Sequence, residues 1–153
     1  MGKYKVIDLF AGAGGLSTGF EMAGFETILA IEIDLWASET YSFNHPKTPI
    51  YTGDITKLTK LNDLIKDNID GIIGGPPCQG FSLSGNRDPK DPRNSLFMEF
   101  VRFIRFYKPN FFLMENVPGL LSMKNAKGEK VIDIIKNEFE NSGYDVDVSI
   151  LDS

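Results

Sequence analysis

The sequence predicts an α/β fold with a doubly wound, mostly parallel, Rossmann-like sheet. Short apolar segments alternate with amphipathic ones, and strands that alternate with helices pair in parallel through right-handed crossovers. A glycine-rich turn, GAGG at residues 12–15, directly follows the first apolar segment. In such sheets, ligands bind beyond the carboxyl ends of the strands, so the residues after each strand are the candidates for chemistry. With 153 residues, the chain is about one domain long.

The first half of the chain contains four of the expected strands and three of the expected helices. The first helix follows the glycine turn and stops at Gly24. The second is capped by Asp34 and ended by Pro46. The expected strands are Lys5–Phe10, Glu26–Ile33, Pro49–Thr52 and Ile69–Gly74, and the expected helices are Leu16–Ala23, Asp34–Asn44 and Lys57–Lys66.

The second half continues the alternation. Apolar residues with helical spacing predict a helix from Asn94 or Ser95 to Tyr107, and such an aromatic stripe is typical of a core. The apolar run NFFLM predicts a fifth strand, Asn110–Met114. A further helix, Lys127–Asn141, is expected to end at Gly143. Apolar residues then alternate with aspartates, which predicts a last strand over 144–151.

Composition indicates an ordinary globular protein, with 42% apolar and 24% charged residues. The single cysteine excludes an internal disulfide. The N-terminus lacks the pattern of a signal peptide, and no apolar run has membrane-spanning length, so we expect a protein of the cytoplasm that does not enter a membrane. The net charge of −5 argues against a strongly nucleic-acid-binding chain. However, residues 85–108 hold six basic and three acidic side chains, either a solvated face or a local binding surface.

The first three strand ends indicate a nucleotide-type ligand. Gly12, Gly14 and Gly15 let backbone approach a ligand closely, and Glu32 follows Gly12 by 20 residues, where an acid binds a ribose diol. Asp54 lies at the end of the third strand and could accept a hydrogen bond from the exocyclic amine of adenine. Each feature alone equally fits a tight turn or a helix cap, but together they favour an adenosine-type ligand. S-adenosylmethionine fits better than NAD, because no hydride-transfer site is evident and acidic groups attract its sulfonium cation.

Two further strand ends carry a thiol and a carboxyl group. Cys78 follows Pro76 and Pro77 after the fourth strand, and Glu115 follows the fifth. A cysteine hydrolase would need a histidine base, and the only histidine, His45, precedes Pro46 at a helix end, which favours a structural role. A thiol that attacks an activated carbon–carbon double bond does not depend on a histidine base in this way, because an acid that protonates the substrate can drive the addition. We expect Cys78 and Glu115 to open onto one crevice, because the fourth and fifth strands should be neighbours.

The motifs resemble those of the DNA (cytosine-5) methyltransferases in order and spacing, along essentially the entire chain. They are DLFAGAGGLSTGF, the acid of AIEID, GDIT, GGPPCQGFS and MENVPG. The resemblance implies the methyltransferase type of sheet and S-adenosylmethionine as the methyl donor. Cys78 would add to carbon 6 of a flipped-out cytosine, and Glu115 would hold and protonate the ring at N3, so that carbon 5 accepts the methyl group.

The resemblance also implies the lining of the cofactor site and contacts to double-stranded DNA. The cofactor-lining positions are Phe10, Gly12, Gly14, Gly15, Glu32, Ile33, Asp54, Ile55 and Pro76. The expected nucleic-acid contacts are Ser82, Arg87, Lys90 and Arg93. The implied activity is a DNA (cytosine-5-)-methyltransferase of a restriction-modification system.

Relatives in this family are longer, so residues 1–153 are expected to form part of a catalytic domain that lacks the target-recognition region and the C-terminal motifs. A second chain could supply them. We therefore expect the isolated chain to bind S-adenosylmethionine weakly or not at all, and not to methylate DNA. Three alternatives stay open: a transfer RNA cytosine-5 methyltransferase, a non-catalytic subunit or fragment of a split enzyme, and an NAD oxidoreductase.

Overall fold

A computed structural model describes residues 4–77, 94–125 and 127–151, with only the backbone of residues 94 and 95. The chain forms two compact units. Unit 1 consists of Met1–Pro76 and Arg102–Glu115, and unit 2 of Pro77–Val101 and Asn116–Ser153.

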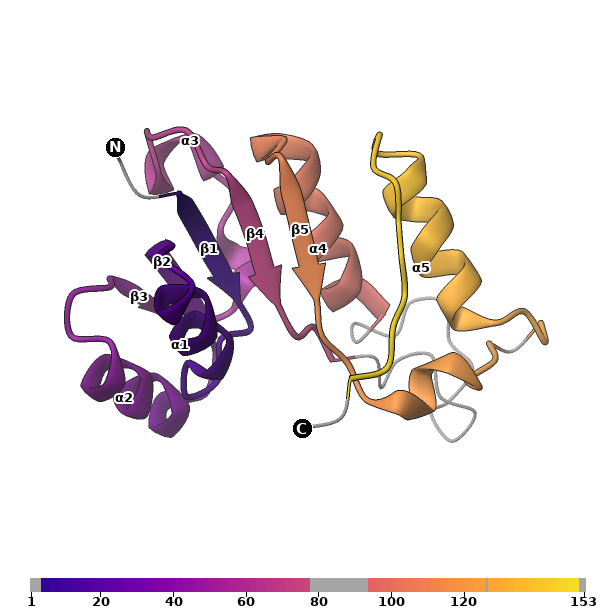
Figure 1. Ribbon diagram of the computed structural model, residues 1–153, viewed down its shortest axis with the longest axis horizontal. Helices are drawn as coiled ribbons and strands as arrows, with labels where there is room; N and C mark the ends of the chain where they lie inside the picture. Colours follow the sequence, from indigo (N-terminus) through magenta and orange to yellow (C-terminus); the bar gives the residue numbers. More distant parts are fainter. Residues whose placement is uncertain (1–3, 78–93, 126, 152–153) are drawn as a thin grey trace. The chain divides into compact units, whose positions relative to one another are not determined.

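Unit 1 contains a five-stranded sheet in the order β3-β2-β1-β4-β5, in which every pair is parallel. The predicted α/β class is therefore confirmed, and so is the pairing of the fourth strand with the fifth. The arrowheads of β1, β4 and β5 point to the same edge of the sheet (Figure 1). The chain order reverses between β1 and β4, which is where ligands of such sheets bind. The strands are β1 (Lys5–Leu9), β2 (Glu26–Glu32), β3 (Ile50–Thr52), β4 (Gly71–Gly74) and β5 (Phe111–Met114).

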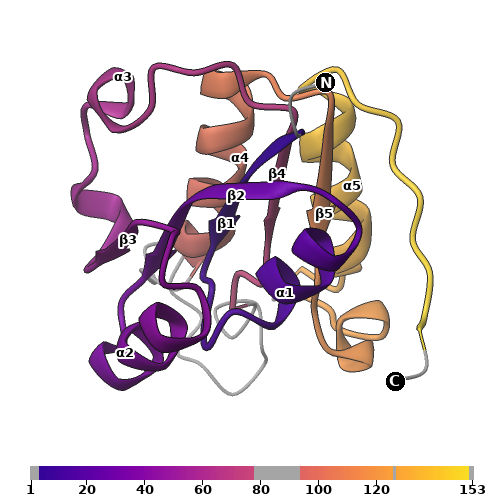
Figure 2. The same ribbon diagram turned by 60° about the vertical axis from the view of Figure 1, so that its left-hand side comes forward.

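Helices cover both faces of this sheet. α1 (Gly15–Met22) lies on one face and the last turns of α4 (Asn94–Tyr107), from Arg102 on, lie on the other (Figures 1 and 2). β1 and β4 are buried on both sides, and their buried side chains are apolar except for Asp8. On the α1 face, the Phe111 ring stacks on Phe20 with centroids 6.1 Å apart. On the α4 face, the Tyr107 hydroxyl donates to the Leu61 carbonyl at 2.7 Å.

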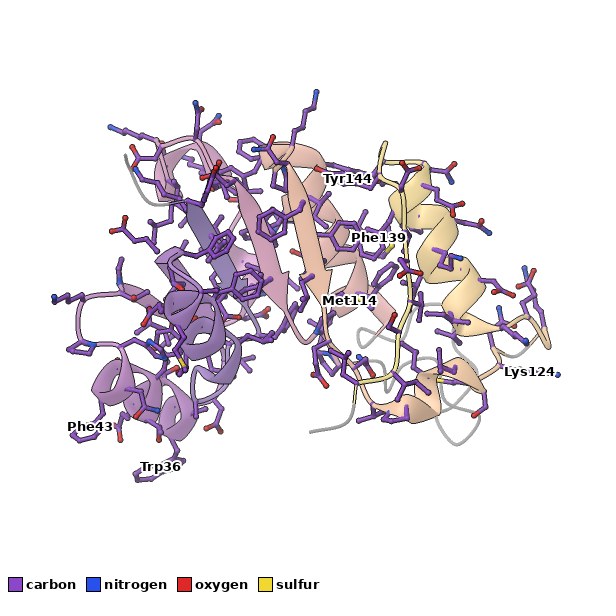
Figure 3. All side chains as sticks on the ribbon, viewed as in Figure 1. Trp36, Phe43, Met114, Lys124, Phe139 and Tyr144 are labelled. Carbon is purple, nitrogen blue, oxygen red and sulfur yellow. The ribbon has the colours of Figure 1, made fainter. Side chains whose placement is uncertain are left out.

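α2 (Leu35–Asn44) follows β2 and exposes several large apolar side chains. Asp34 caps it as predicted, since its carboxylate accepts from the Ala37 N–H at 2.8 Å. Tyr41 is fully buried. By contrast, Trp36 and Phe43 are 75% and 86% exposed and project outward from the helix (Figure 3). α2 is thus anchored by one side only.

Unit 2 has its own small core. The short 3₁₀ helix η3 (Pro118–Leu121) and α5 (Val131–Glu140) belong to it, with the first turns of α4. Val131, Ile135 and Phe139 are buried at helical spacing on α5. Phe139 meets Phe97 edge-on, with ring centroids 5.6 Å apart, which is the favoured aromatic geometry.

Three predicted elements differ from the structure. The helix predicted over 57–66 is reduced to η1 (Ile55–Lys57) and α3 (Leu61–Leu64). The reason is that the Leu58 carbonyl accepts from Arg102 at 3.0 Å instead of joining a continuous helix. The helix predicted from Lys127 begins only at Val131, because the Asn125 side chain accepts from the Lys127 and Glu129 N–H groups and holds a turn.

The predicted last strand over 144–151 is wrong for the residues described. Residues 144–151 are not in a strand, although Tyr144 and Val146 are more buried than the aspartates between and after them. Val148, Ile150 and Leu151 are exposed. The alternating pattern therefore occurs without a paired strand among the described residues, and a pattern alone does not make a strand.

In the part of the chain that the structure describes, no helix combines the length and the apolar character needed to cross a membrane.

Candidate functional site

The glycine turn after β1 has the backbone shape of a ligand cradle. Phe10, Gly12 and Gly14 all have positive φ, at 58°, 55° and 95°. A left-handed conformation is costly for phenylalanine, and such strain is characteristic of functional sites. A Cβ built on Gly12 would meet nothing within 4 Å, so one side of the turn is open. Gly15 then begins α1.

Glu32, the last residue of β2, is tied to this turn. Its Oε2 accepts from the Gly12 N–H at 2.8 Å, and its Oε1 accepts from the Ile33 and Asp34 N–H groups, both at 2.8 Å. A carboxylate offers about four acceptor positions, so three backbone donors leave room for one more hydrogen bond. The Ile33 side chain beside it is 68% exposed. The end of β2 thus presents one acceptor position and one apolar surface.

Asp54 lies after β3, where it caps η1. Its Oδ1 accepts from the Thr56 N–H at 2.9 Å and from the Thr56 hydroxyl at 2.7 Å. These bonds lower the pKa of Asp54, so the group is ionised. Its Oδ2 has no hydrogen-bond partner among the described residues. Asp54 can therefore cap η1 through Oδ1 and still accept a hydrogen bond from a ligand through Oδ2.

Arg102 fixes this same turn from α4. Its guanidinium donates to the Ile55 carbonyl at 3.2 Å and to the Leu58 carbonyl at 3.0 Å. The Ile55 side chain is buried beneath the turn. Arg102 is one of the basic residues of the 85–108 cluster, and these two of its hydrogen bonds lie within unit 1.

A buried polar chain lies behind the glycine turn. The Ser17 hydroxyl donates to Asp8 Oδ2 at 2.7 Å and lies 2.7 Å from the Tyr41 hydroxyl. Asp8 is fully buried, and its other oxygen, Oδ1, has no hydrogen-bond partner in the described structure. Burial raises the pKa of Asp8 to about 6, although the bond from Ser17 opposes the shift. β1, α1 and α2 are joined through these three side chains.

The edge formed by β4 and β5 carries Glu115. The Glu115 N–H donates to the Gly74 carbonyl at 3.0 Å, which continues the β4–β5 ladder by one residue. A Cβ built on Gly75 would lie 3.2 Å from Glu115 Oε2, so the carboxylate lies against the Gly75 backbone. Glu115 is exposed, and Pro76 is buried after β4.

Five of the predicted site residues fall outside the described residues. They are Cys78, Ser82, Arg87, Lys90 and Arg93. The other predicted residues are described and all lie in unit 1, at the carboxyl ends of its strands. The structure therefore brings the predicted cofactor positions and Glu115 to one edge of one sheet.

Comparison with known proteins identifies the family. Residues 4–153 match the sequence model of C-5 cytosine-specific DNA methylases. This chain belongs to that family. Over 150 residues it is 62% identical to the type II methyltransferase M.DdeI of Desulfomicrobium norvegicum, covering 97% of this chain and 36% of that protein. The type II methyltransferase M.FnuDI of Fusobacterium nucleatum is 49% identical over 150 residues, with 97% of this chain and 42% of that protein covered.

The fold agrees with this family. The solved S. pombe Dnmt2 methyltransferase superposes with a TM-score of 0.71 at 28% identity, over 91% of this chain and 42% of that one. The chain therefore spans well under half the length of these relatives.

Three side chains of this chain contact the candidate site although the sequence did not predict them there. They are Asn44, His45 and Arg102, which hydrogen-bond to the backbone of the two strand-end turns. His45 was expected to be structural, which its 4% exposure supports. Pro46 predicts where the helix ends, but the sequence gives no signal for the turn that Asn44 and His45 reach.

Proposed function

We propose that this chain forms the cofactor-binding and nucleophile-bearing part of a type II restriction-modification enzyme. The activity is that of a DNA (cytosine-5-)-methyltransferase with S-adenosylmethionine as methyl donor. The observation that carries this proposal is the placement of Glu32 and Glu115 at one edge of the sheet, on either side of the β1–β4 reversal. One carboxylate suits a ribose and the other a pyrimidine ring.

The described residues fit an adenosine-type methyl donor. Glu32 has one acceptor position left for a ribose hydroxyl, and Asp54 Oδ2 is available for an exocyclic amine. Ile33 offers an exposed apolar surface for the adenine face. The open side of Gly12 leaves space for the amino acid part, next to the N-terminus of α1. Phe10, Gly14, Gly15, Ile55 and Pro76 complete the proposed lining.

The protein's own groups would then work on the cytosine. The Cys78 sulfur forms a bond to carbon 6, which breaks the aromaticity of the ring. The Glu115 carboxyl group holds and protonates N3, so that electron density builds up at carbon 5. S-adenosylmethionine supplies the methyl group and is left as S-adenosylhomocysteine. Loss of the carbon 5 proton to a base, departure of the Cys78 thiolate from carbon 6 and return of the N3 proton to Glu115 restore the ring. Glu115 lies against Gly75, and Cys78 follows Gly75 by three residues in the sequence, which supports one shared substrate.

The partners follow from the same proposal. Double-stranded DNA is the substrate, and a cytosine inside a duplex must be flipped out to reach the thiol. Ser82, Arg87, Lys90 and Arg93 are proposed to contact it. We further propose that residues 1–153 are the amino-terminal part of the catalytic domain. The target-recognition region and C-terminal motifs come from further sequence or a second chain. The named relatives are bacterial, which supports a cytoplasmic location.

The test uses the assembled enzyme, by which we mean this chain together with the sequence or chain that supplies the rest of the catalytic domain. It is mixed with labelled S-adenosylmethionine and a DNA duplex that carries 5-fluorocytosine. Fluorine replaces the proton at carbon 5 whose loss would otherwise release the enzyme from the adduct. We expect a protein–DNA adduct that survives denaturation and is absent from Cys78→Ser. Methyl incorporation is compared between duplex DNA and transfer RNA.

Label that enters only transfer RNA would replace the DNA proposal by the RNA alternative. No adduct and no incorporation with either nucleic acid would contradict the proposed chemistry.

A further inference from the structure

The turn that carries Gly12 and Gly14 is held on its far side by the end of α2. The Asn44 Nδ2 donates to the Ala13 carbonyl at 2.9 Å, across 31 residues of sequence. The next residue, His45, places its Nε2 3.1 Å from the Gly14 carbonyl. Two consecutive side chains thus bind two consecutive carbonyls of the turn.

His45 also fills the space behind the turn. A Cβ built on Gly14 would lie 2.4 Å from His45 Nε2, so the absence of a side chain at this position is what admits the ring. His45 is buried and packs on Tyr41, with ring centroids 4.6 Å apart. Tyr41 in turn lies at the end of the buried chain that reaches Asp8 on β1. The ring is therefore fixed on both sides.

The His45 ring lies between two acceptors. On one side, Nε2 lies 3.1 Å from the Gly14 carbonyl and 3.3 Å from the Thr18 hydroxyl, so the hydrogen bond to Gly14 requires the tautomer with a proton on Nε2. On the other side, Nδ1 lies 3.2 Å from both oxygens of the Glu21 carboxylate, which is also an acceptor. α1, through Glu21, and α2, through His45, are joined across the turn that they flank.

We propose that Asn44 and His45 form a clamp that keeps the glycine turn in its ligand-binding shape, and so act as positioning residues for the methyl donor. The clamp touches the turn through the carbonyls of Ala13 and Gly14, while the Gly12 N–H faces Glu32 and the open side of Gly12 faces away from neighbouring atoms. Ordering the turn before binding removes an entropic cost that the cofactor would otherwise meet. This inference rests on the proposed cofactor.

The decisive variant is Asn44→Asp. It keeps the size of the side chain and removes the donor, and Asn44 is exposed, so the fold is retained. His45→Gln is the second variant. Thr40→Ala is the matched control, since the Thr40 hydroxyl donates only to the Trp36 carbonyl within the same helix.

Two measurements are made. Hydrogen–deuterium exchange in this chain without ligand follows the amides of residues 12–15. In the assembled enzyme, the KM for S-adenosylmethionine and kcat are measured separately. Loss of one hydrogen bond corresponds to about a two- to tenfold change, so we expect exchange and KM to rise by that factor in Asn44→Asp and His45→Gln. We expect kcat at saturating cofactor to stay the same, and Thr40→Ala to change neither quantity.

The clamp is wrong if Asn44→Asp leaves both the exchange and KM at wild-type values, or if Thr40→Ala changes them equally. A fall in kcat with unchanged KM also contradicts it. Failure of the proposed function looks different: exchange of the turn would rise in the variants while the wild type did not bind S-adenosylmethionine.

Discussion

Glu32 and Glu115 occupy the ends of two strands at the same edge of the sheet, yet their carboxylates are held in opposite ways. Glu32 is half-buried and accepts three backbone hydrogen bonds. Glu115 is exposed, and its carboxylate has no hydrogen-bond partner among the described residues. The difference fits two separate proposed roles, cofactor binding for Glu32 and contact with the cytosine for Glu115. Three backbone hydrogen bonds hold the Glu32 carboxylate in one position, which fits the proposed binding of a ribose, whereas no described residue holds the Glu115 carboxylate, which fits the proposed contact with a substrate.

The largest expected effect comes from removing the acid. Glu115→Gln in the assembled enzyme should lower kcat by about a hundred- to ten-thousandfold, the usual contribution of a general acid. Stability should change little, because the side chain is exposed and no described residue hydrogen-bonds to its carboxylate. Methyl incorporation into duplex DNA and thermal unfolding measure the two quantities. Glu140→Gln, an exposed glutamate on α5, is the control. Full activity of Glu115→Gln would remove the contrast between the two glutamates.

A second effect concerns the support behind the cofactor turn and depends on pH. Folding raises the pKa of Asp8 from 3.8 to about 6. A raised acid pKa stabilises the fold at low pH, and this stabilisation is lost as the pH rises through about 6. Wild type loses this stabilisation as the pH rises, whereas Asp8→Asn has no carboxyl group to ionise. The unfolding free energy of Asp8→Asn minus that of wild type should therefore increase by up to about 3 kcal/mol between about pH 4 and about pH 7.

Urea unfolding at several pH values measures this difference. The exposed Asp147→Asn is the control and should follow wild type throughout. A constant difference between Asp8→Asn and wild type across the range would mean that Asp8 is not buried as a charge behind the turn.

The smallest expected effect concerns the turn after β3. Arg102→Ala removes two hydrogen bonds to the carbonyls of Ile55 and Leu58. The unfolding free energy should fall by about 1–3 kcal/mol, the usual cost of losing bonds to a charged group. Lys66→Ala, at an exposed basic residue of the same unit, should cost less. Equal losses for the two variants would contradict the role of Arg102 at the turn.

Much of the sheet could be predicted from local pattern. β1, β2, β4 and β5 are short runs rich in apolar residues, and the predicted bounds of each lie within two residues of the observed bounds. Long-range contacts overrode local pattern elsewhere. Arg102 takes the Leu58 carbonyl and breaks a predicted helix, and the alternation of 144–151 has no strand beside it in the described residues. Propensity cannot show either effect.

The site was predictable to the same degree. Glu32 and Asp54 could be found because they follow strands of a parallel sheet. Asn44 and His45 could not, because their partners, Ala13 and Gly14, lie 31 residues away and a capping or clamping residue has no periodic signature.

The most direct test of the division between the two glutamates is calorimetric titration of the assembled enzyme with S-adenosylhomocysteine, the product of the methyl donor. Glu32→Gln should weaken binding by about tenfold or more, since it loses a charge-assisted acceptor. Glu115→Gln should bind as wild type does. Equal affinities for Glu32→Gln and wild type, or weaker binding for Glu115→Gln than for Glu32→Gln, would contradict the assignment of the cofactor to the β2 end and the cytosine to the β5 end.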